Sequence, residues 1–551
     1  MSDATITEAD ILAAEALLGV SYTAPERALM VGSVEGQIGS AKTARAVVLP
    51  NSAPMALRFD PRPPGFCMPT GPGRLRFSTG APPLPAAAED IAFAPLPHLS
   101  AWIAAGALSS RALTEIYLAR IEAIGPKLEC FATVTADLAR AEAAAADALL
   151  AAGVWLGPLH GVPYALKDLF DTKGIVTGWG AEPYRSRAPE ADAAIVTRLR
   201  AAGAVLLGKA TVGALAYNDI WYGGRTRNPW NLNEGSSGSS AGSASATAAG
   251  LCGFAIGTER LGSITSPSQR CGTTGLRPTY GRVSRTGGMA LCNTLDKVGP
   301  ICRGVEDTAI VLAALNGGDP TDRGSIDAPF SFDATAGIEG LRVGYLPEAF
   351  GEGATGVDHA ALAAVRGLGV ELREVSLPDL PYGALMNVVY AEAAATFQEL
   401  TLTGQDDTLT WQEAGAWPNV FRMARFLSAV DHVHLDRLRY QVMLALDGLF
   451  TDIDVLIGPF STGPMLVASN FTGHPCLHLR AGFIDSATRG AASLASGKLE
   501  TGAAGAEIHT FRVPQGISLW GRLFEEGTIL RLGLALERVL DVAAERPGFD
   551  A

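Results

Sequence analysis

Alternating helical and strand-like hydrophobic patterns run through most of the chain. Residues 99–124 carry apolar side chains at helical spacing, with the Ser109–Ser110 pair as a helix N-cap, and an Ala-rich stretch predicts a long helix over 135–152. Residues 195–211 read as a helix, a glycine turn and a short apolar strand, and residues 357–377 repeat that order. Such alternation predicts an α/β fold, with a large, mostly parallel mixed sheet and helices on both faces.

The first 88 residues differ from the rest of the chain. They read as helical at first and as extended around residues 46–50, and residues 60–85 are dense in proline and glycine. Proline at this density removes backbone donors and blocks helices. The full length of 551 residues is also long for one compact core. We therefore expect an N-terminal extension and connector over 1–88 and one large domain over 89–551.

Composition and charge exclude several classes of protein. The net charge is −13 and no cluster of Lys and Arg stands out, which disfavours a nucleic-acid partner. No apolar run reaches the roughly 18 residues of a membrane helix, and the acidic N-terminus differs from that of a signal peptide. The 7 cysteines are scattered without a CxxC pair, which argues against a disulfide framework and a zinc site. These features predict a cytoplasmic protein without a metal or an organic cofactor.

Candidate chemistry begins with a lysine at the end of an apolar run. Residues 162–166 (VPYAL) predict a strand that is followed directly by Lys167. A lone lysine in such a position is most often a surface charge. Burial, however, penalises the ammonium form and would leave Lys167 as a neutral base.

Two further segments are rich in serine and small residues. By composition, residues 234–250 (EGSSGSSAGSASATAAG) are typical of a flexible linker, but they lie between apolar segments and predict a Ser/Gly turn that caps a small-residue helix. Residues 251–258 predict a buried strand, and the glycine-flanked Ser263 follows it. A nucleophilic serine needs free backbone N–H groups nearby, although an ordinary turn has the same sequence pattern.

Other catalytic motifs are absent or weak. The sequence contains no HExxH, no P-loop and no GxGxxG after a strand. GSSAG matches GxSxG on Ser240, which chance explains in a Ser/Gly-rich run. His160, His474 and His478 lie near turns, but not in a convincing order for a Ser–His–Asp triad.

Taken together, these segments resemble the amidase signature family over about residues 95–540. GVPYALKDLFDTKG resembles that family's lysine segment, GSSAGSASATAAG its Gly-Ser-Ser segment, and GTERLGSITSPSQRCGTTGLRP its nucleophile segment. The resemblance implies a triad in which Ser263 is the nucleophile, Ser239 the bridging serine and Lys167 the base. The family spaces its two serines 24 residues apart, which selects Ser239 over Ser236.

The resemblance also implies a set of supporting groups. Four backbone N–H groups would form an oxyanion hole, and they belong to Arg260, Leu261, Gly262 and Ser263. The family has a cis peptide before its bridging serine, here Gly238–Ser239. The residues expected to support the site are Gly238, Ser240, Thr258 and Glu259.

The chain departs from the family's pattern at several positions. The family often reads GTDTGGSIR where this chain reads GTERLGSIT, so that Glu259 replaces Asp and Thr265 replaces Arg. A branch resembling peptide amidases has the same two residues. Leu261 adds bulk beside the oxyanion loop, and Ser518 stands where the family often has Gln. These departures leave the identity of the substrate open.

We therefore expect an amide hydrolase for a small-molecule carboxamide, or an esterase or carbamate hydrolase with the same triad. The aromatic residues of 217–224 either line the substrate pocket or pack in the core, and residues 384–433 are expected to shape the acyl side. One alternative is the glutamine-hydrolysing subunit of a tRNA-dependent amidotransferase, which needs a partner. Another is a non-catalytic binding protein with the same fold. Family members are often dimers, so the resemblance implies a homodimer.

Overall fold

A sheet of 11 strands forms the centre of the molecule in the computed structural model, which describes residues 5–492, 499–501 and 509–549. In spatial order its strands are β14 (Glu371–Glu374), β13 (Arg342–Tyr345), β15 (Val455–Pro459), β19 (Thr510–Gly521), β16 (Cys476–Ala487), β10 (Thr274–Arg277), β11 (Lys297–Cys302), β9 (Phe254–Glu259), β3 (Pro163–Lys167), β4 (Val205–Ala210) and β2 (Phe131–Val134).

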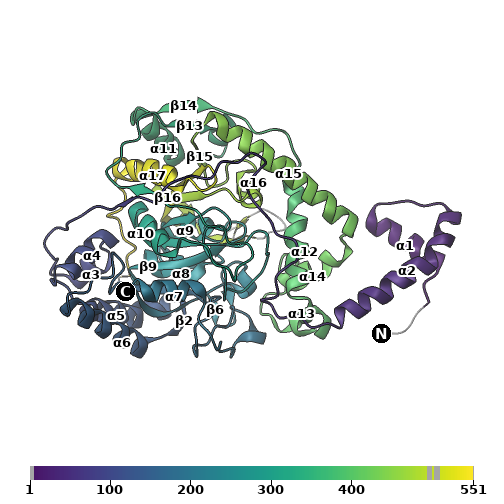
Figure 1. Cartoon of the computed structure of the whole chain (residues 1–551), viewed down its shortest axis with the longest axis horizontal. Coiled ribbons are helices and arrows are strands. Elements are labelled where there is room, and N and C mark those ends of the chain that lie inside the picture. The colour runs from purple at the N-terminus through teal and green to yellow at the C-terminus, as the bar shows by residue number, and fades with distance from the viewer. Residues whose placement is uncertain (1–4, 493–498, 502–508, 550–551) are drawn as a thin grey trace.

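Helices cover both faces of this sheet, which confirms the predicted fold class (Figure 1). The helices of the main body are α3 (Ala88–Ala92), α4 (Leu96–Ala104), α5 (Ser110–Leu128), α6 (Ala136–Ala151), α7 (Ala194–Ala201), α8 (Ala241–Ala248), α9 (Thr265–Cys271), α10 (Val305–Leu315), α11 (Gly356–Gly367), α12 (Met386–Thr396), α13 (Gln398–Thr403), α14 (Trp417–Met423), α15 (Ala429–Asp452), α16 (Met465–Thr472) and α17 (Glu526–Leu540).

The pairing directions correct one detail of the prediction. Four neighbouring pairs are parallel, namely β3/β4, β3/β9, β13/β14 and β13/β15. The other six pairs of the sheet are antiparallel, so the sheet is mixed rather than mostly parallel. The helix–glycine–strand units read from the sequence do form parallel pairs. Antiparallel strands also follow this order, since β10 comes after α9 and Gly272 and β16 after α16 and Gly473, so the unit alone does not predict a parallel pair.

Short two-stranded sheets complete the strand inventory. They pair β1 (Leu75–Arg76) with β12 (Phe332–Asp333), β5 (Ile220–Trp221) with β6 (Gly224–Arg225), β7 (Arg227–Asn228) with β8 (Asn231–Gly235), and β17 (Arg489–Ala492) with β18 (Leu499–Thr501).

Local sequence signals account for several elements around the site. The Ser109 hydroxyl accepts the Ala112 N–H at 3.0 Å and so caps α5, as predicted. The Ser/Gly/Ala segment forms α8, whose residues are all buried. A Cβ atom at Gly242 of α8 would lie 2.2 Å from the Cys130 carbonyl oxygen, so only glycine fits there. Small residues therefore let α8 approach the strands closely.

The N-terminal segment lies along the outside of the molecule. Helices α1 (Glu8–Leu18) and α2 (Ala24–Arg45) pack on each other and extend beyond the body, on the side of α13, α14 and α15 (Figure 1). The chain then returns to the body, where the Asn51 side chain donates to the Ala290 carbonyl and accepts the Ala290 N–H, both at 2.9 Å. Phe59 packs edge-on against Tyr280 with ring centroids 5.0 Å apart.

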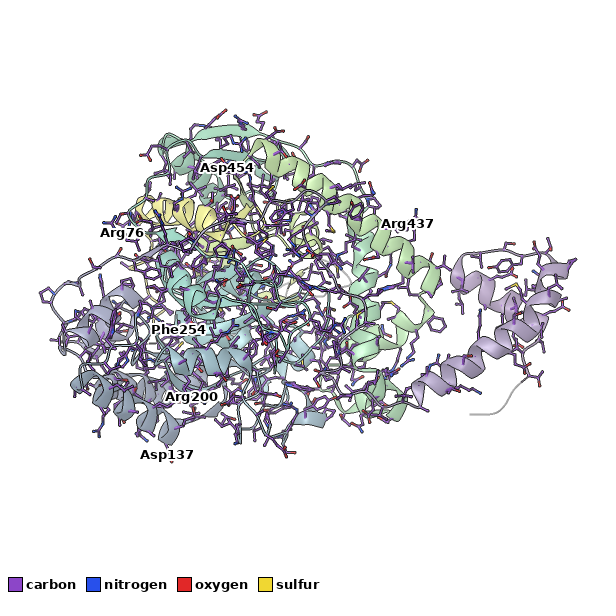
Figure 2. The ribbon with its side chains drawn as sticks, viewed as in Figure 1. Arg76, Asp137, Arg200, Phe254, Arg437 and Asp454 are labelled. Carbon is purple, nitrogen blue, oxygen red and sulfur yellow. The ribbon has the colours of Figure 1, made fainter. Side chains whose placement is uncertain are left out.

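Apolar side chains make up most of the interior, in which a smaller set of charged residues is also buried. Figure 2 shows Phe254 within the body, whereas Asp137 and Arg437 lie at the surface. No helix in the part of the chain that the structure describes is both long and apolar enough to cross a membrane.

Phe254 tests the packing of the parallel β3/β9 pair. Its ring stacks on Tyr164 with centroids 5.3 Å apart, and it is fully buried. We expect Phe254→Ala to destabilise the fold by about 3–5 kcal/mol, because it removes an aromatic ring and leaves a cavity. Thermal unfolding measures the effect, with the exposed Leu149→Ala as control. Equal losses in the two variants would contradict this packing.

Candidate active site

Lys167 ends β3 inside the protein. Its side chain is fully buried, and Nζ lies 2.8 Å from Ser239 Oγ, 3.0 Å from Ser240 Oγ and 2.9 Å from Thr258 Oγ1. Burial holds the pKa of Lys167 well below its usual value, and Asp296 only partly offsets this. Among the described residues, no carboxylate forms an ion pair with this amine. The surroundings of Lys167 therefore favour a neutral amine.

Hydrogen-bond directions distinguish the two serines. A neutral amine has two N–H groups and one lone pair, so one of its three hydroxyl neighbours can donate to it. Ser240 Oγ is 3.2 Å from the Thr258 carbonyl and accepts the Thr258 N–H at 3.2 Å, so its proton already has an acceptor. Ser239 Oγ contacts only the amine among the groups that the structure describes. Ser239 is therefore free to give its proton to Lys167.

The peptide bond between Gly238 and Ser239 is cis. A Cβ atom at Gly238 would lie 1.8 Å from the Asn218 carbonyl oxygen, so a side chain has no room there. The next residues begin α8, and Ser240 N–H donates to the Ser263 carbonyl at 3.2 Å. This bond joins the Gly-Ser-Ser segment to the segment of Ser263.

Ser263 follows β9 in a short loop before α9. Its side chain is 7% exposed, and Gly262 before it has φ +85°, a conformation that favours glycine. Ser263 Oγ forms no hydrogen bond to the residues that the structure describes, Ser239 included. The backbone N–H groups of residues 260–263 likewise have no acceptor among the described residues. The loop thus presents a free hydroxyl and several free donors together.

Glu259 holds this loop in place. One of its carboxylate oxygens accepts the N–H groups of Ile264 and Thr265 at 2.9 and 3.0 Å. The other accepts from Arg277 at 2.7 Å and from Asn470 at 3.0 Å. Burial alone would raise the pKa of Glu259, but these partners, chiefly Arg277, lower it to about 2. Glu259 is therefore an anion that fixes the loop on both sides of Ser263.

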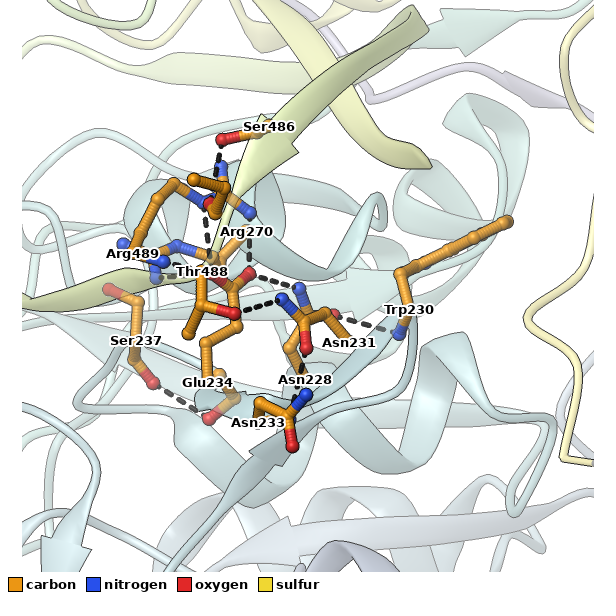
Figure 3. Close-up of polar contacts among 12 residues, drawn as sticks. Asn228, Trp230, Asn231, Asn233, Glu234, Ser237, Arg270, Ser486, Thr488 and Arg489 are labelled. Carbon is orange, nitrogen blue, oxygen red and sulfur yellow. Dashed lines mark hydrogen bonds and ion pairs between the residues drawn. The ribbon is translucent and has the colours of Figure 1, made fainter. Parts of the chain in front are cut away.

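A second buried acid anchors the Gly-Ser-Ser segment. The Glu234 carboxylate accepts from Arg489 Nη2 at 2.6 Å and from the Asn228 amide at 2.7 Å, as Figure 3 shows. Arg270 of α9 lies 3.6 Å from the same carboxylate. Glu234 immediately precedes the serine-rich turn and so ties it to α9 and to β17.

A cavity of about 310 Å³ opens beside Thr258. Leu169, Ala216 and Asp296 line it from the main domain. Met55 and Phe59 line it from the N-terminal segment, so residues before position 88 contribute to its wall.

The structure also places the remaining residues that the sequence singled out. Thr265 donates its hydroxyl to Glu259 at 3.1 Å, and Leu261 packs against the edge of the hydrophobic core. Ser518 is buried and bonds the His478 ring at 2.9 Å. In the segment 217–224, Tyr217 packs against Trp417, with ring centroids 5.2 Å apart.

Sequence reasoning missed the buried partners that fix the two loops. Arg277, Asn470 and Arg489 each contact a single acid in the interior, and Asn470 and Arg489 lie far from the serines along the chain. Sequence patterns identify buried positions from regularly spaced apolar residues. A charged residue that is buried is not part of such a pattern, so a single sequence does not indicate it.

Comparisons with known proteins identify the family of the chain. The Amidase family matches residues 112–530. The chain is 36% identical over 495 residues to a glutamyl-tRNA(Gln) amidotransferase subunit from Roseiflexus sp. (strain RS-1), a match that covers 80% of this chain and 95% of that protein.

Solved structures show the same relationship. The peptide amidase from Stenotrophomonas maltophilia superposes with a TM-score of 0.69 at 28% identity, covering 83% of this chain and 99% of that one. A bacterial aryl acylamidase has the same fold, with a TM-score of 0.68 at 22% identity over 83% of this chain and 99% of its own. Because the family match extends over more than half of the sequence, this chain belongs to the Amidase family, the amidase signature enzymes that its lysine and serine segments resemble.

Proposed function

We propose that the chain hydrolyses the C–N bond of a small carboxamide through an acyl-enzyme on Ser263. The observation that carries this proposal is the buried amine of Lys167, which has three hydroxyl neighbours and no counter-charge among the described residues. Family membership makes the chain an amidase. The roles of the individual residues are the proposed part.

The proton moves along a short path. Ser239 gives its proton to neutral Lys167 and takes the proton of Ser263, whose Oγ attacks the substrate carbonyl. The C–N bond then breaks, the leaving amine takes the proton back along the same path, and water releases the carboxylic acid from Ser263. The Ser239–Ser263 contact forms when substrate binds, since catalytic hydrogen bonds often tighten only in the complex.

The oxyanion is stabilised by the loop that carries the nucleophile. The N–H groups of residues 260–263 have no acceptor among the described residues and belong to the short loop that carries Ser263, so they are free to donate to an oxyanion. One such donor is typically worth about 10²–10³ in rate. Glu259 acts as a positioning residue, because it holds the N–H groups immediately after Ser263.

Two other reactions use the same groups. The triad would also cleave an ester or a carbamate, which differ from an amide only in the leaving group. The relatives named glutamyl-tRNA(Gln) amidotransferase favour glutamine hydrolysis within a larger assembly as the second candidate. That candidate requires a partner chain, so glutamine hydrolysis that appears only with a co-purifying partner separates it from a stand-alone amidase. A non-catalytic binding protein would not react through Ser263.

We further infer a cytoplasmic location and a homodimer. All 7 cysteines are unpaired, and all but Cys67 are buried, which a reducing compartment favours. Helices α1 and α2 expose apolar side chains such as Leu17 and Leu29, which a second copy of the chain would cover.

A fluorophosphonate probe tests for the activated serine without knowledge of the substrate. We expect one adduct on the wild type, mapped to Ser263 by intact mass and peptide analysis, and none on Ser263→Ala or Lys167→Ala. Ser266→Ala is the matched control, since its hydroxyl contacts Ser237 at 2.8 Å and it should still label. A wild type that does not label would overturn the proposal. The same Ser263→Ala change should lower kcat by about 10⁴–10⁶-fold on any amide that is hydrolysed.

The pH dependence tests Lys167 as the base. Only the unprotonated amine accepts a proton, so kcat/KM should rise with pH and level off above the pKa of Lys167. Burial lowers that pKa, so the plateau is reached well below pH 10.5. Lys167→Arg should be inactive throughout, because a guanidinium stays protonated.

Lys209→Met is the control for this profile. Lys209 is also buried, and burial lowers its pKa to about 8, but it donates to the Phe170 carbonyl and to Thr177 rather than to a serine. The pH at which kcat/KM reaches half of its plateau should therefore be the same in Lys209→Met as in the wild type. A midpoint that shifts in Lys209→Met, or activity that falls as pH rises, would contradict the role of Lys167 as the base.

Glu259→Gln tests the anion that holds the loop. The pKa of Glu259 falls from 4.5 to about 2 on folding, so its charge stabilises the fold above pH 4.5, and this contribution is lost as pH falls toward 2. The shift corresponds to about 3 kcal/mol. Between pH 5 and 2 the wild type should lose about that much more stability than Glu259→Gln in denaturant unfolding. Parallel pH profiles would show that Glu259 is not a buried anion.

A further inference from the structure

Arg260 is a buried cation in the loop that carries the nucleophile. It lies three positions before Ser263 and is 4% exposed. Its guanidinium carbon lies 5.0 Å from the centre of the Trp417 ring, in the arrangement of a cation–π contact. The cation therefore lies between the nucleophile loop and α14.

Two of the three guanidinium nitrogens lack a hydrogen-bond acceptor. Its Nε and Nη1 atoms are buried and have no hydrogen-bond partner, and no ion pair reaches Arg260 within the described residues. The other deeply buried arginines differ, and each has an acceptor for its charge. Arg277 donates to Glu259, Arg282 to the Phe524 carbonyl and Arg439 to the Phe471 carbonyl.

The groups nearest to Arg260 do not neutralise it. Burial raises the pKa of the Cys292 thiol and of the Tyr390 phenol, and Arg260 opposes both shifts, at Cys292 partly through a side-chain hydrogen bond. The Cys292 thiol donates to the Val389 carbonyl. Asp296, whose pKa Arg260 also lowers against the effect of burial, already accepts the N–H groups of Leu291 and Cys292 and forms no ion pair with Arg260 among the described residues. Lys167, the other titratable neighbour, offers no negative charge.

We propose that Arg260 binds a carboxylate of the substrate, so that the enzyme acts on amides that carry a negative charge near the scissile bond. A buried guanidinium with free N–H groups is costly unless an anion pairs with it, and its planar fork matches a carboxylate. Trp417 forms a cation–π contact with the guanidinium, and Thr258, two positions before Arg260, lines the cavity of about 310 Å³. This inference rests on the proposed function and names its substrate class.

Two kinds of substrate meet this requirement. The carboxylate belongs either to the acyl half, as in an ω-amido acid, or to the amine half, as in an N-acyl amino acid. Both place the anion a few atoms from the carbonyl that Ser263 attacks. Paired probes that differ only in the carboxylate separate the two sources.

The test is protection of Ser263 from fluorophosphonate labelling. Succinamate is compared with butyramide, and glutaramate with valeramide, for the acyl half; N-acetylglycine is compared with N-ethylacetamide for the amine half. In one of the two series, the carboxylate member should protect the wild type at concentrations about 10- to 100-fold lower than its neutral counterpart, the usual range for a charge-assisted hydrogen bond.

Variants of Arg260 test whether the preference for carboxylate probes depends on this side chain. Arg260→Met should abolish the difference between the paired probes, and Arg260→Lys should keep part of it, because it retains the charge without the fork. Arg480→Met is the matched control. Arg480 also stacks on a tryptophan, Trp230 at 5.6 Å, but donates to the Val542 and Glu545 carbonyls. Its removal should leave the preference for carboxylates unchanged.

The outcomes separate this inference from the proposed function. If the wild type labels on Ser263 but carboxylate and neutral probes protect it equally, the inference is overturned and the amidase mechanism stands. A preference that survives in Arg260→Met also overturns it. If the wild type does not label at all, the proposed function fails first and the inference fails with it. The wild-type comparison needs no variant, so it decides the question even if Arg260→Met does not fold.

Discussion

The active site depends on removing one amine from water without giving it a counter-charge. Lys167 is fully buried, and its neighbours are three hydroxyl groups rather than a carboxylate. Elsewhere in the core, Lys209 keeps an acid, Asp168, at 3.7 Å. Burial lowers the pKa of both lysines, but only Lys167 is left with hydroxyl protons to accept. The position of β3 between β9 and β4, with all five of its residues buried, makes this desolvation possible.

Two buried anions keep the serines near that amine. Glu259 fixes the loop of Ser263, and Glu234 fixes the turn before Ser239. Each acid is matched by arginine, so its charge is compensated inside the protein. Arg260 forms no ion pair among the described residues, and its Nε and Nη1 atoms have no hydrogen-bond partner. The same loop therefore contains a paired charge that holds the backbone and an unpaired one available to a ligand.

The sequence predicted the local parts of this arrangement. The apolar run before Lys167 forms β3, and the small-residue segment forms the buried helix α8, because strand burial and close packing leave direct compositional signals. The antiparallel pairing of β16 with β19 was not predicted, since it depends on contacts between distant segments. The same reason hid Arg277 and Asn470, whose importance comes only from the acid they meet. The resemblance named Ser239, while the contact with Lys167 explains why that serine is suited to the role.

The protonation state of Lys167 is the central claim, and NMR of the lysine side-chain nitrogens measures it directly. The sequence contains few lysines, so labelling lysine alone gives a small set of signals, and Lys167→Arg identifies the one that belongs to Lys167. Burial of Lys167 predicts an amine that stays neutral down to a pH well below the usual lysine value of 10.5. A Lys167 signal that remains an ammonium up to about pH 10, the ordinary lysine pKa, would contradict it.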